Sequence, residues 1–230
     1  MKKKQKMKMK LLLLMLAGVV FVRSQDLTLC VVTAKRPRNY LPDLIRGLER
    51  EKAEYLIVDV DNSTLPSIGA LRLQGKGREC VDGPVPCPMQ QQGIDIARGL
   101  LLCASSHNSK WIALVEDDMA ICPGAMATMN TVIKRILPFK TARFAKFSRA
   151  TVFPIENIKP YTDYVFDHVH ETPHDILLNF NWVDGYDYIH EGSLFTHVGQ
   201  MSTIAERNDP VYIATYSSLR DEKCGTPLFK

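Results

Sequence analysis

Through the first two thirds of this 230-residue chain, short apolar runs alternate with segments whose apolar residues recur at helical spacing. Three runs have the length and β-rich composition of buried strands: Leu27–Thr33, Tyr55–Val60 and Trp111–Val115. Apolar residues at helical spacing follow each of them, over residues 41–48, 94–104 and 126–137. This order predicts an α/β fold with a mostly parallel sheet flanked by helices. No linker-like segment divides it, so we expect a single domain.

Polar residues stand at the ends of all three predicted strands. The groups are Thr33–Arg36, Asp59–Asp61 and Glu116–Asp118. In open α/β sheets, ligands bind beyond the carboxyl ends of the strands, so we expect the functional site at this edge. The sequence contains neither Gly-x-Gly-x-x-Gly nor a Walker-type loop. Their absence argues against a dinucleotide-dependent dehydrogenase and a P-loop NTPase.

The first 24 residues have the composition of a targeting segment. Six Lys precede a run of twelve uncharged residues, Leu11–Val22, which Arg23 and Ser24 follow. A membrane span needs about 20 apolar residues, so we expect residues 1–24 to be a secretory signal peptide, or a signal anchor if uncleaved. Residues 25–230 would then be a lumenal domain of the ER or Golgi, or a secreted one. Contact with a membrane would be made only by the N-terminal segment.

Charge separates this leader from the rest of the chain. The sequence has a net charge of +4, but the leader alone contributes +7. Residues 25–230 therefore hold 22 basic and 25 acidic residues and are mildly acidic. Nucleic-acid binding requires a basic surface on the folded body, so we expect no nucleic acid as a partner.

Six cysteines and one glycosylation triplet agree with a secretory location. Asn62-Ser63-Thr64 is that triplet. The even cysteine count favours disulfides. We expect the pair Cys80–Cys87, which lies in a Gly- and Pro-rich segment, residues 75–88, predicted to be an irregular loop. Cys30 lies in an apolar run, a setting that is also typical of a buried free thiol.

Glu116, Asp117 and Asp118 are the strongest local indication of chemistry. Three successive carboxylates repel one another, and a hard divalent cation such as Mg²⁺ or Mn²⁺ stabilises such a group. The alternative is a solvated turn whose acids cap the following helix. On the triplet alone, the two interpretations are about equal.

The ends of the first two strands offer nucleotide contacts. Asp59 and Asp61 alternate onto the same face of their strand, as a metal or ribose site would require. A glycan at Asn62 would crowd a metal there, so we rank this pair as a nucleotide contact. Lys35 and Arg36 follow the first strand directly, where exposed backbone amides and positive charge suit a phosphate. Ordinary surface charge is the alternative interpretation of Lys35 and Arg36.

Two residues of the last third add candidate roles. His197 ends an apolar segment before Val198-Gly199 and could complete a metal site begun by the acidic triplet. Thr172-Pro173-His174-Asp175 has the pattern of a helix start, with Thr172 at the N-cap and Pro173 at the first helical position. If that helix end faces the site, its dipole would hold Asp175 ionised, as a general base requires.

Five segments occur together in one order. They are Thr33-Ala-Lys-Arg-Pro37, Val115-Glu-Asp-Asp-Met119, Lys146-Phe-Ser148, Pro173-His-Asp-Ile-Leu-Leu178 and Ser193-Leu-Phe-Thr-His-Val-Gly199. This combination resembles the catalytic domain of the N-acetylglucosaminyltransferase IV family, the β-1,4-GlcNAc branching enzymes of N-glycans. The resemblance covers roughly Leu29 to Ile204. Its most specific parts are the Glu-Asp-Asp strand end and Leu-Phe-x-His-Val-Gly.

The resemblance implies a GT-A-like glycosyltransferase. The enzyme would transfer GlcNAc from UDP-GlcNAc to a glycan acceptor with inversion, using Mn²⁺ (or Mg²⁺) as cofactor. The acidic motif would be Glu116, Asp117 and Asp118, with Asp118 and His197 as metal ligands. Thr33, Lys35 and Arg36 would line the donor nucleotide, and Asp175 would be the base that deprotonates the acceptor hydroxyl.

Three other functions are alternatives to a branching enzyme. A related group adds a GalNAc side chain to GPI glycolipids through a core interrupted by transmembrane segments. No second apolar stretch of spanning length occurs in this sequence, so the branching enzymes match it better. The second alternative is a non-catalytic module that binds carbohydrate or nucleotide sugar. The third is a metal-dependent phosphohydrolase, whose second ligand set would have to come from Asp59 and Asp61.

Overall fold

The computed structural model describes residues 26–34, 39–60, 70–73, 79–145, 150–178, 188–198 and 223–225. The larger sheet consists of β1 (Leu27–Thr33), β2 (Tyr55–Asp59), β3 (Leu71–Arg72), β4 (Trp111–Glu116), β6 (Ala142–Arg143), β7 (Ala150–Pro154) and β8 (Tyr188–Ile189). Its strand order is β3-β2-β1-β4-β7-β6-β8. A second sheet pairs β5 (Met119–Ile121) with β9 (Phe195–His197). The helices are α2 (Leu41–Arg50), α3 (Cys87–Ser106), α4 (Ala125–Ile136), α5 (Ile155–His168) and α6 (His174–Ile176).

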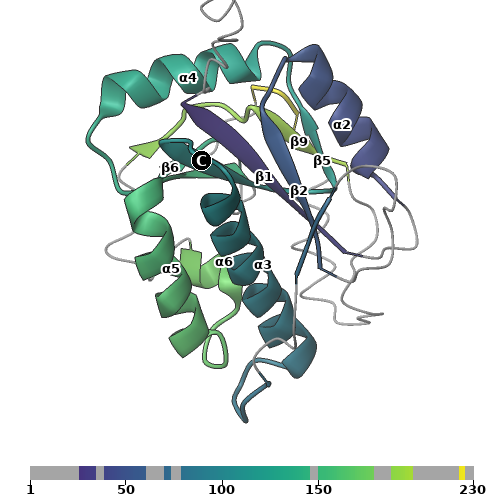
Figure 1. Ribbon diagram of the computed structural model, residues 1–230, viewed down its shortest axis with the longest axis vertical. Helices are drawn as coiled ribbons and strands as arrows, with labels where there is room; N and C mark the ends of the chain where they lie inside the picture. The colour runs from purple at the N-terminus through teal and green to yellow at the C-terminus, as the bar shows by residue number, and fades with distance from the viewer. Residues whose placement is uncertain are drawn as a thin grey trace, which may run out of the picture.

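The helices cover both faces of the larger sheet, which gives three layers (Figure 1). Helices α2 and α4 lie on one face, and α3, α5 and α6 lie on the other. Successive residues of the central strands point to opposite faces, so Leu29 of β1 packs with α2 and α4 while Cys30 packs with α3. Because β1 and β4 are buried on both faces, their sequences are continuous apolar runs without polar alternation.

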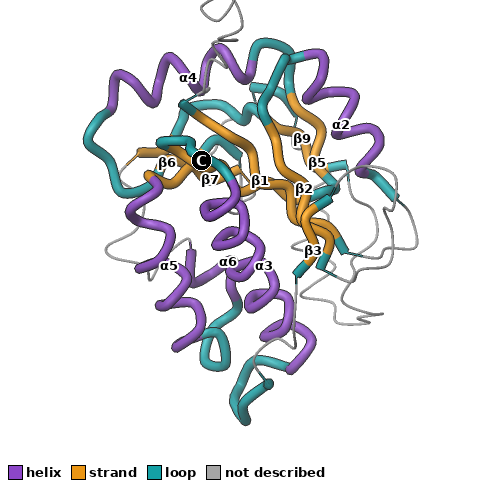
Figure 2. Tube along the Cα trace, viewed as in Figure 1, coloured by secondary structure: helices purple, strands orange, loops and turns teal. Residues whose placement is uncertain are grey.

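The predicted α/β fold with a mostly parallel sheet is confirmed. The three predicted strands are β1, β2 and β4, and they pair in parallel in the order β2-β1-β4. Further along the sheet, β7 pairs antiparallel with both β4 and β6. Figure 2 shows these strands as one continuous layer between the helices. The described residues contain no helix long and apolar enough to cross a membrane, and the predicted leader lies outside them.

One predicted boundary was wrong. Residues 75–88 were expected to be an irregular loop, but α3 already begins at Cys87. Pro86 is its N-cap, and Pro88 lies in the first turn. Proline fits this position because its fixed φ suits a helix and its missing N–H has no helical partner there. The prolines that indicated a loop therefore also begin the helix.

All six cysteines are paired, as expected in an oxidising compartment. The predicted pair Cys80–Cys87 is confirmed. The expectation that Cys30 could be a free thiol was wrong, because β1 and α3 pack directly against each other and bring it to Cys103. The third disulfide joins Cys122, directly after β5, to Cys224 in the C-terminal segment 223–225.

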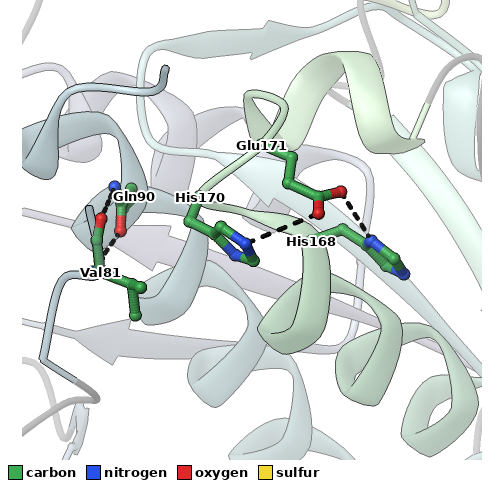
Figure 3. Close-up of polar contacts among 5 residues, drawn as sticks. All are labelled: Val81, Gln90, His168, His170 and Glu171. Atoms are coloured by element: carbon green, nitrogen blue, oxygen red, sulfur yellow. Dashed lines mark hydrogen bonds and ion pairs between the residues drawn. The ribbon is translucent and has the colours of Figure 1, made fainter. Parts of the chain in front are cut away.

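The loop closed by Cys80–Cys87 docks against the turn between α5 and α6. The amide of Val85 donates a hydrogen bond to the carbonyl oxygen of His170 at 3.3 Å. A Cβ atom on Gly83 would overlap that same oxygen, so only glycine permits this approach. Figure 3 shows His168 and His170 both facing Glu171 in the turn. The hydrogen bond with His168 lowers the pKa of the Glu171 carboxyl.

Gln90 fixes the other side of this loop (Figure 3). Its side chain is buried in α3. The Nε2 atom donates to the carbonyl oxygens of Val81 and Val85, both at 2.8 Å, and Oε1 accepts from the amide of Val81 at 3.0 Å. One side-chain amide thus satisfies three backbone groups of a loop that has no regular structure.

We expect Gln90→Met to destabilise the protein by about 2 kcal/mol, because it keeps the side-chain volume but leaves three backbone groups without these bonds. Urea denaturation checks the value. Gln91→Met is the matched control in the same turn, since its Nε2 bonds only the half-buried Asp95. Equal stability losses in the two variants would contradict the role assigned to Gln90.

Candidate active site

The candidate site lies where the chain reverses its direction across the sheet. From β1 the chain proceeds through α2 to β2 on one side, and it returns through α3 to β4 on the other side of β1. Helices α2 and α3 lie on opposite faces (Figure 1). The carboxyl ends of β1 and β4 therefore border a topological switch point, where open α/β sheets bind ligands. Thr33 ends β1, and Glu116 ends β4.

A buried hydrogen bond joins the two strand ends. Oγ1 of Thr33 donates to Oδ2 of Asp117 at 2.6 Å, and both residues are buried. Asp117 and Asp118 form the turn between β4 and β5. A short bond from a hydroxyl to a carboxylate is charge-assisted and holds that carboxylate in one orientation. Thr33 therefore fixes Asp117 at the entrance to the turn.

His197 meets Asp118 on the other side of this turn. Its Nε2 lies 3.1 Å from Oδ2 of Asp118, and their side chains are 2 and 4% exposed. The pairing of β5 with β9 produces this contact, since Met119 lies opposite His197. The amide of Val198 also donates to the carbonyl oxygen of Asp118 at 2.9 Å. Residues 79 positions apart in sequence thus form one buried pair.

The chemistry of this pair fits a divalent cation. Adjacent ligand atoms of an octahedral ion lie about 3 Å apart when each is about 2.1 Å from the metal. Oδ2 of Asp118 and Nε2 of His197 lie 3.1 Å apart in a direct hydrogen bond, and this distance is also close to that separation. The described residues contain no group of three or more His, Cys, Asp or Glu suited to a metal. Two protein ligands suit an ion that is completed by phosphate oxygens and water.

The other predicted residues surround this centre or lie outside the described residues. Asp59 is buried at the end of β2, opposite Thr33 in the β1–β2 register. Glu116 is half-buried and lies opposite Val32. The structure thus brings Thr33, Asp59, the acidic triplet and His197 to the edge of the sheet formed by the carboxyl ends of β1, β2 and β4. Lys35, Arg36, Asp61 and the triplet at Asn62 lie outside the described residues.

Asp175 lies in α6, which packs against the N-terminal half of α3. A Cβ atom on Gly93 of α3 would lie 3.0 Å from Cβ of His174, so glycine allows this close contact. Thr172 was predicted as N-cap and Pro173 as the first helical residue, which was wrong by one position. Pro173 has extended backbone and is the N-cap, so the helix begins at His174. The side chain of Asp175 is outside what the structure describes.

A second polar cluster lies at the opposite end of the strands. His107 forms contacts with Ser109, at 2.9 Å, and with Glu54, at 2.7 Å. These residue types occur in hydrolase triads, but Ser109 is 5% exposed and its hydroxyl also bonds Thr28 at 2.6 Å. A nucleophile must reach its substrate. This cluster therefore joins β1, β2 and β4 at their starts and is not a candidate active site.

No family model matches the chain, and no curated protein matches its sequence. Among solved structures, the chain is similar to a glycosyltransferase involved in glycosylation of the major capsid of PBCV-1. That match has a TM-score of 0.45 and 11% identity, and it covers 76% of this chain and 94% of the other.

Two further solved structures are similar. Residues 1–349 of S. aureus TarS, in complex with UDP-GlcNAc, have a TM-score of 0.39 and 10% identity, over 78% of this chain and 62% of that chain. A mutant of Drosophila β1,4-galactosyltransferase 7 with manganese, UDP-Gal and xylobiose has a TM-score of 0.36 and 13% identity. This match covers 89% of this chain and 83% of the other chain. At TM-scores below 0.5, none of these likenesses assigns the chain to a family.

Proposed function

We propose that this protein is a metal-dependent, inverting glycosyltransferase of the GT-A type. It transfers GlcNAc from UDP-GlcNAc to a glycan acceptor, as its resemblance to the N-glycan branching enzymes implies. The observation that supports this most is the buried Asp118–His197 pair at the switch point of the sheet. It joins the two most specific segments of that resemblance, the Glu-Asp-Asp strand end and Leu-Phe-x-His-Val-Gly, in one place.

The residues at this edge divide into metal and nucleotide contacts. Asp118 and His197 hold the divalent cation, Mn²⁺ or Mg²⁺, together with the donor diphosphate. When bound, the cation stabilises the negative charge that develops on the leaving diphosphate. Thr33 orients Asp117 beside this pair. Five residues at or directly after the three strand ends in the sequence contact the nucleotide: Lys35, Arg36, Asp59, Asp61 and Glu116.

Asp175 is the general base of the proposed reaction. The acceptor hydroxyl oxygen attacks the anomeric carbon, while the bond from that carbon to the diphosphate oxygen breaks and its electron pair leaves with UDP. The Asp175 carboxylate accepts the hydroxyl proton. A single in-line displacement inverts the anomeric centre, so an α-linked donor gives a β-linked product. The place of Asp175 in Pro173-His-Asp-Ile-Leu-Leu178, one of the segments of the resemblance, supports this role.

The test is a turnover assay with residues 25–230. The protein is incubated with Mn²⁺ and a panel of UDP-sugars, with and without glycan acceptors, and UDP release is followed. We expect release with UDP-GlcNAc and an N-glycan acceptor, lost on adding EDTA. Turnover only with UDP-GalNAc and a GPI glycan would favour the GPI-modifying alternative. UDP binding without turnover would favour a non-catalytic module, and metal-dependent cleavage of simple phosphate esters would favour a phosphohydrolase.

Asp175→Asn is expected to lower kcat at least ~10²-fold and to leave the binding of UDP and Mn²⁺ unchanged, as loss of a general base does. The substitution keeps the size of the side chain but removes its ability to accept a proton. Steady-state kinetics and UDP titration measure the two effects separately. Asp167→Asn, in the preceding helix α5, is the control. Wild-type kcat in Asp175→Asn would exclude the residue as the base.

The secretory pathway is the proposed location, in the Golgi or ER lumen. Three disulfides within the folded domain and the N-terminal segment 1–24 support it. Fusing residues 1–24 to a reporter protein would test the targeting function. A reporter that stays in the cytosol would contradict this location.

A further inference from the structure

The C-terminal segment 223–225 is bound along the strand that bears His197. Figure 1 shows this segment in yellow beside β9. The amide of Gly225 donates to the carbonyl oxygen of Ser193 at 2.9 Å. Oγ1 of Thr196, in β9, lies 3.5 Å from Sγ of Cys224. Gly192 approaches so closely that a Cβ atom there would lie 3.2 Å from Cα of Gly225.

The same segment is covalently joined to the residue that follows β5, the strand that pairs with β9. Cys224 forms a disulfide with Cys122, the residue that follows β5. The amide of Cys122 in turn donates to the carbonyl oxygen of Leu194 at 3.0 Å, just before β9. The disulfide therefore lies at the Ile121–Phe195 end of the two-stranded sheet. Asp118 and His197 lie at its other end.

This small sheet needs such support. Its strands have three residues each, and an isolated two-stranded sheet is marginally stable in water. Met119, Ile121 and Phe195 anchor it to the core. Its polar end holds the Asp118–His197 contact, which exists only while β5 and β9 stay in register. A shift by one residue would turn His197 to the opposite face.

We propose that the Cys122–Cys224 disulfide is a positioning clamp for the metal site. By holding segment 223–225 against β9, it keeps β9 in register with β5 and His197 on Asp118. Cys122, Cys224 and Gly225 are thus positioning residues, since they act on the site only through His197. The effect on metal binding rests on the proposed function, whereas the effect on the placement of His197 does not.

The test compares two disulfide variants. Cys122→Ser/Cys224→Ser removes the clamp, and Cys80→Ser/Cys87→Ser removes a disulfide from the loop before α3 as the matched control. One readout is the dissociation constant of UDP at saturating Mn²⁺, by titration calorimetry. The other is the position of the His197 ring resonances in NMR spectra of the metal-free protein. Gly192→Ala is a milder variant that pushes segment 223–225 outward with the disulfide intact.

We expect the clamp variant to bind UDP with Mn²⁺ ~10–100-fold more weakly, the loss typical when the support of a metal ligand is removed. The His197 resonances shift in the clamp variant and, to a smaller extent, in Gly192→Ala. Neither readout changes in the Cys80/Cys87 control. Unchanged His197 resonances in both the clamp variant and Gly192→Ala would overturn the clamp. If wild-type protein binds no UDP with Mn²⁺, the proposed function is wrong. The His197 resonances would still show whether the Cys122–Cys224 disulfide positions His197.

Discussion

Asp118→Asn is expected to abolish metal-dependent turnover. The substitution keeps the side-chain shape beside His197 but removes the negative charge that a hard cation requires. A metal ion contributes several kcal/mol to the stabilisation of a leaving diphosphate, which corresponds to a rate loss of ~10³-fold or more. UDP release from UDP-GlcNAc measures the rate, and calorimetry with UDP and Mn²⁺ measures the accompanying loss of binding.

The control for this variant is Asp163→Asn on α5. Asp163 is half exposed and, within the described part of the chain, pairs with Lys159 in the preceding turn of the helix, so we expect its substitution to leave turnover unchanged. Circular dichroism would establish that both variants are folded. Wild-type turnover in Asp118→Asn would contradict the assignment of this residue as a metal ligand.

Removal of the Cys30–Cys103 disulfide is expected to cause a larger loss of stability than removal of Cys80–Cys87. The two cysteines are 73 residues apart, and closing a loop of that length lowers the free energy of folding by about 4 kcal/mol in the chain-entropy model. Both side chains are fully buried between β1 and α3, so Cys30→Ala/Cys103→Ala also leaves space in the core. Urea denaturation measures the difference.

Cys80→Ala/Cys87→Ala is the comparison for this prediction. Its cysteines are only 7 residues apart, and the same model gives about 2.5 kcal/mol for so short a loop. The larger loss is therefore expected for Cys30–Cys103. A larger loss for Cys80–Cys87 would show that loop length does not determine how these disulfides stabilise the protein.

The central part of the fold could be predicted from sequence because local pattern and burial agree there. β1 and β4 are buried on both faces, so each contains a long apolar run that the sequence displays directly. The strand–helix order also predicted parallel strands joined by right-handed crossovers, whereas the position of β1 between β2 and β4 is known only from the structure. By contrast, β6 and β8 have two residues each, and so short an element leaves no periodic pattern.

The candidate site could be predicted in part. The setting of Asp118 and His197 suggested that they could share a metal site, and the β5–β9 pairing brings them together. The bond from Thr33 to Asp117 could not be predicted, because it depends on two strands whose order in the sheet is set by tertiary packing. The same holds for Cys122–Cys224, whose partners are 102 residues apart. Nothing local in the sequence selects one of the fifteen pairings of six cysteines.

The most direct test of the proposed metal site is whether the Asp118–His197 pair binds a divalent cation together with UDP. Free Mn²⁺ can be followed by electron paramagnetic resonance as residues 25–230 are titrated in the presence and absence of UDP. We predict that the protein lowers the free Mn²⁺ signal in the presence of UDP. We also predict that Asp118→Asn combined with His197→Gln abolishes this effect. Equal Mn²⁺ binding by wild type and the double variant would contradict the metal site at the centre of the proposed function.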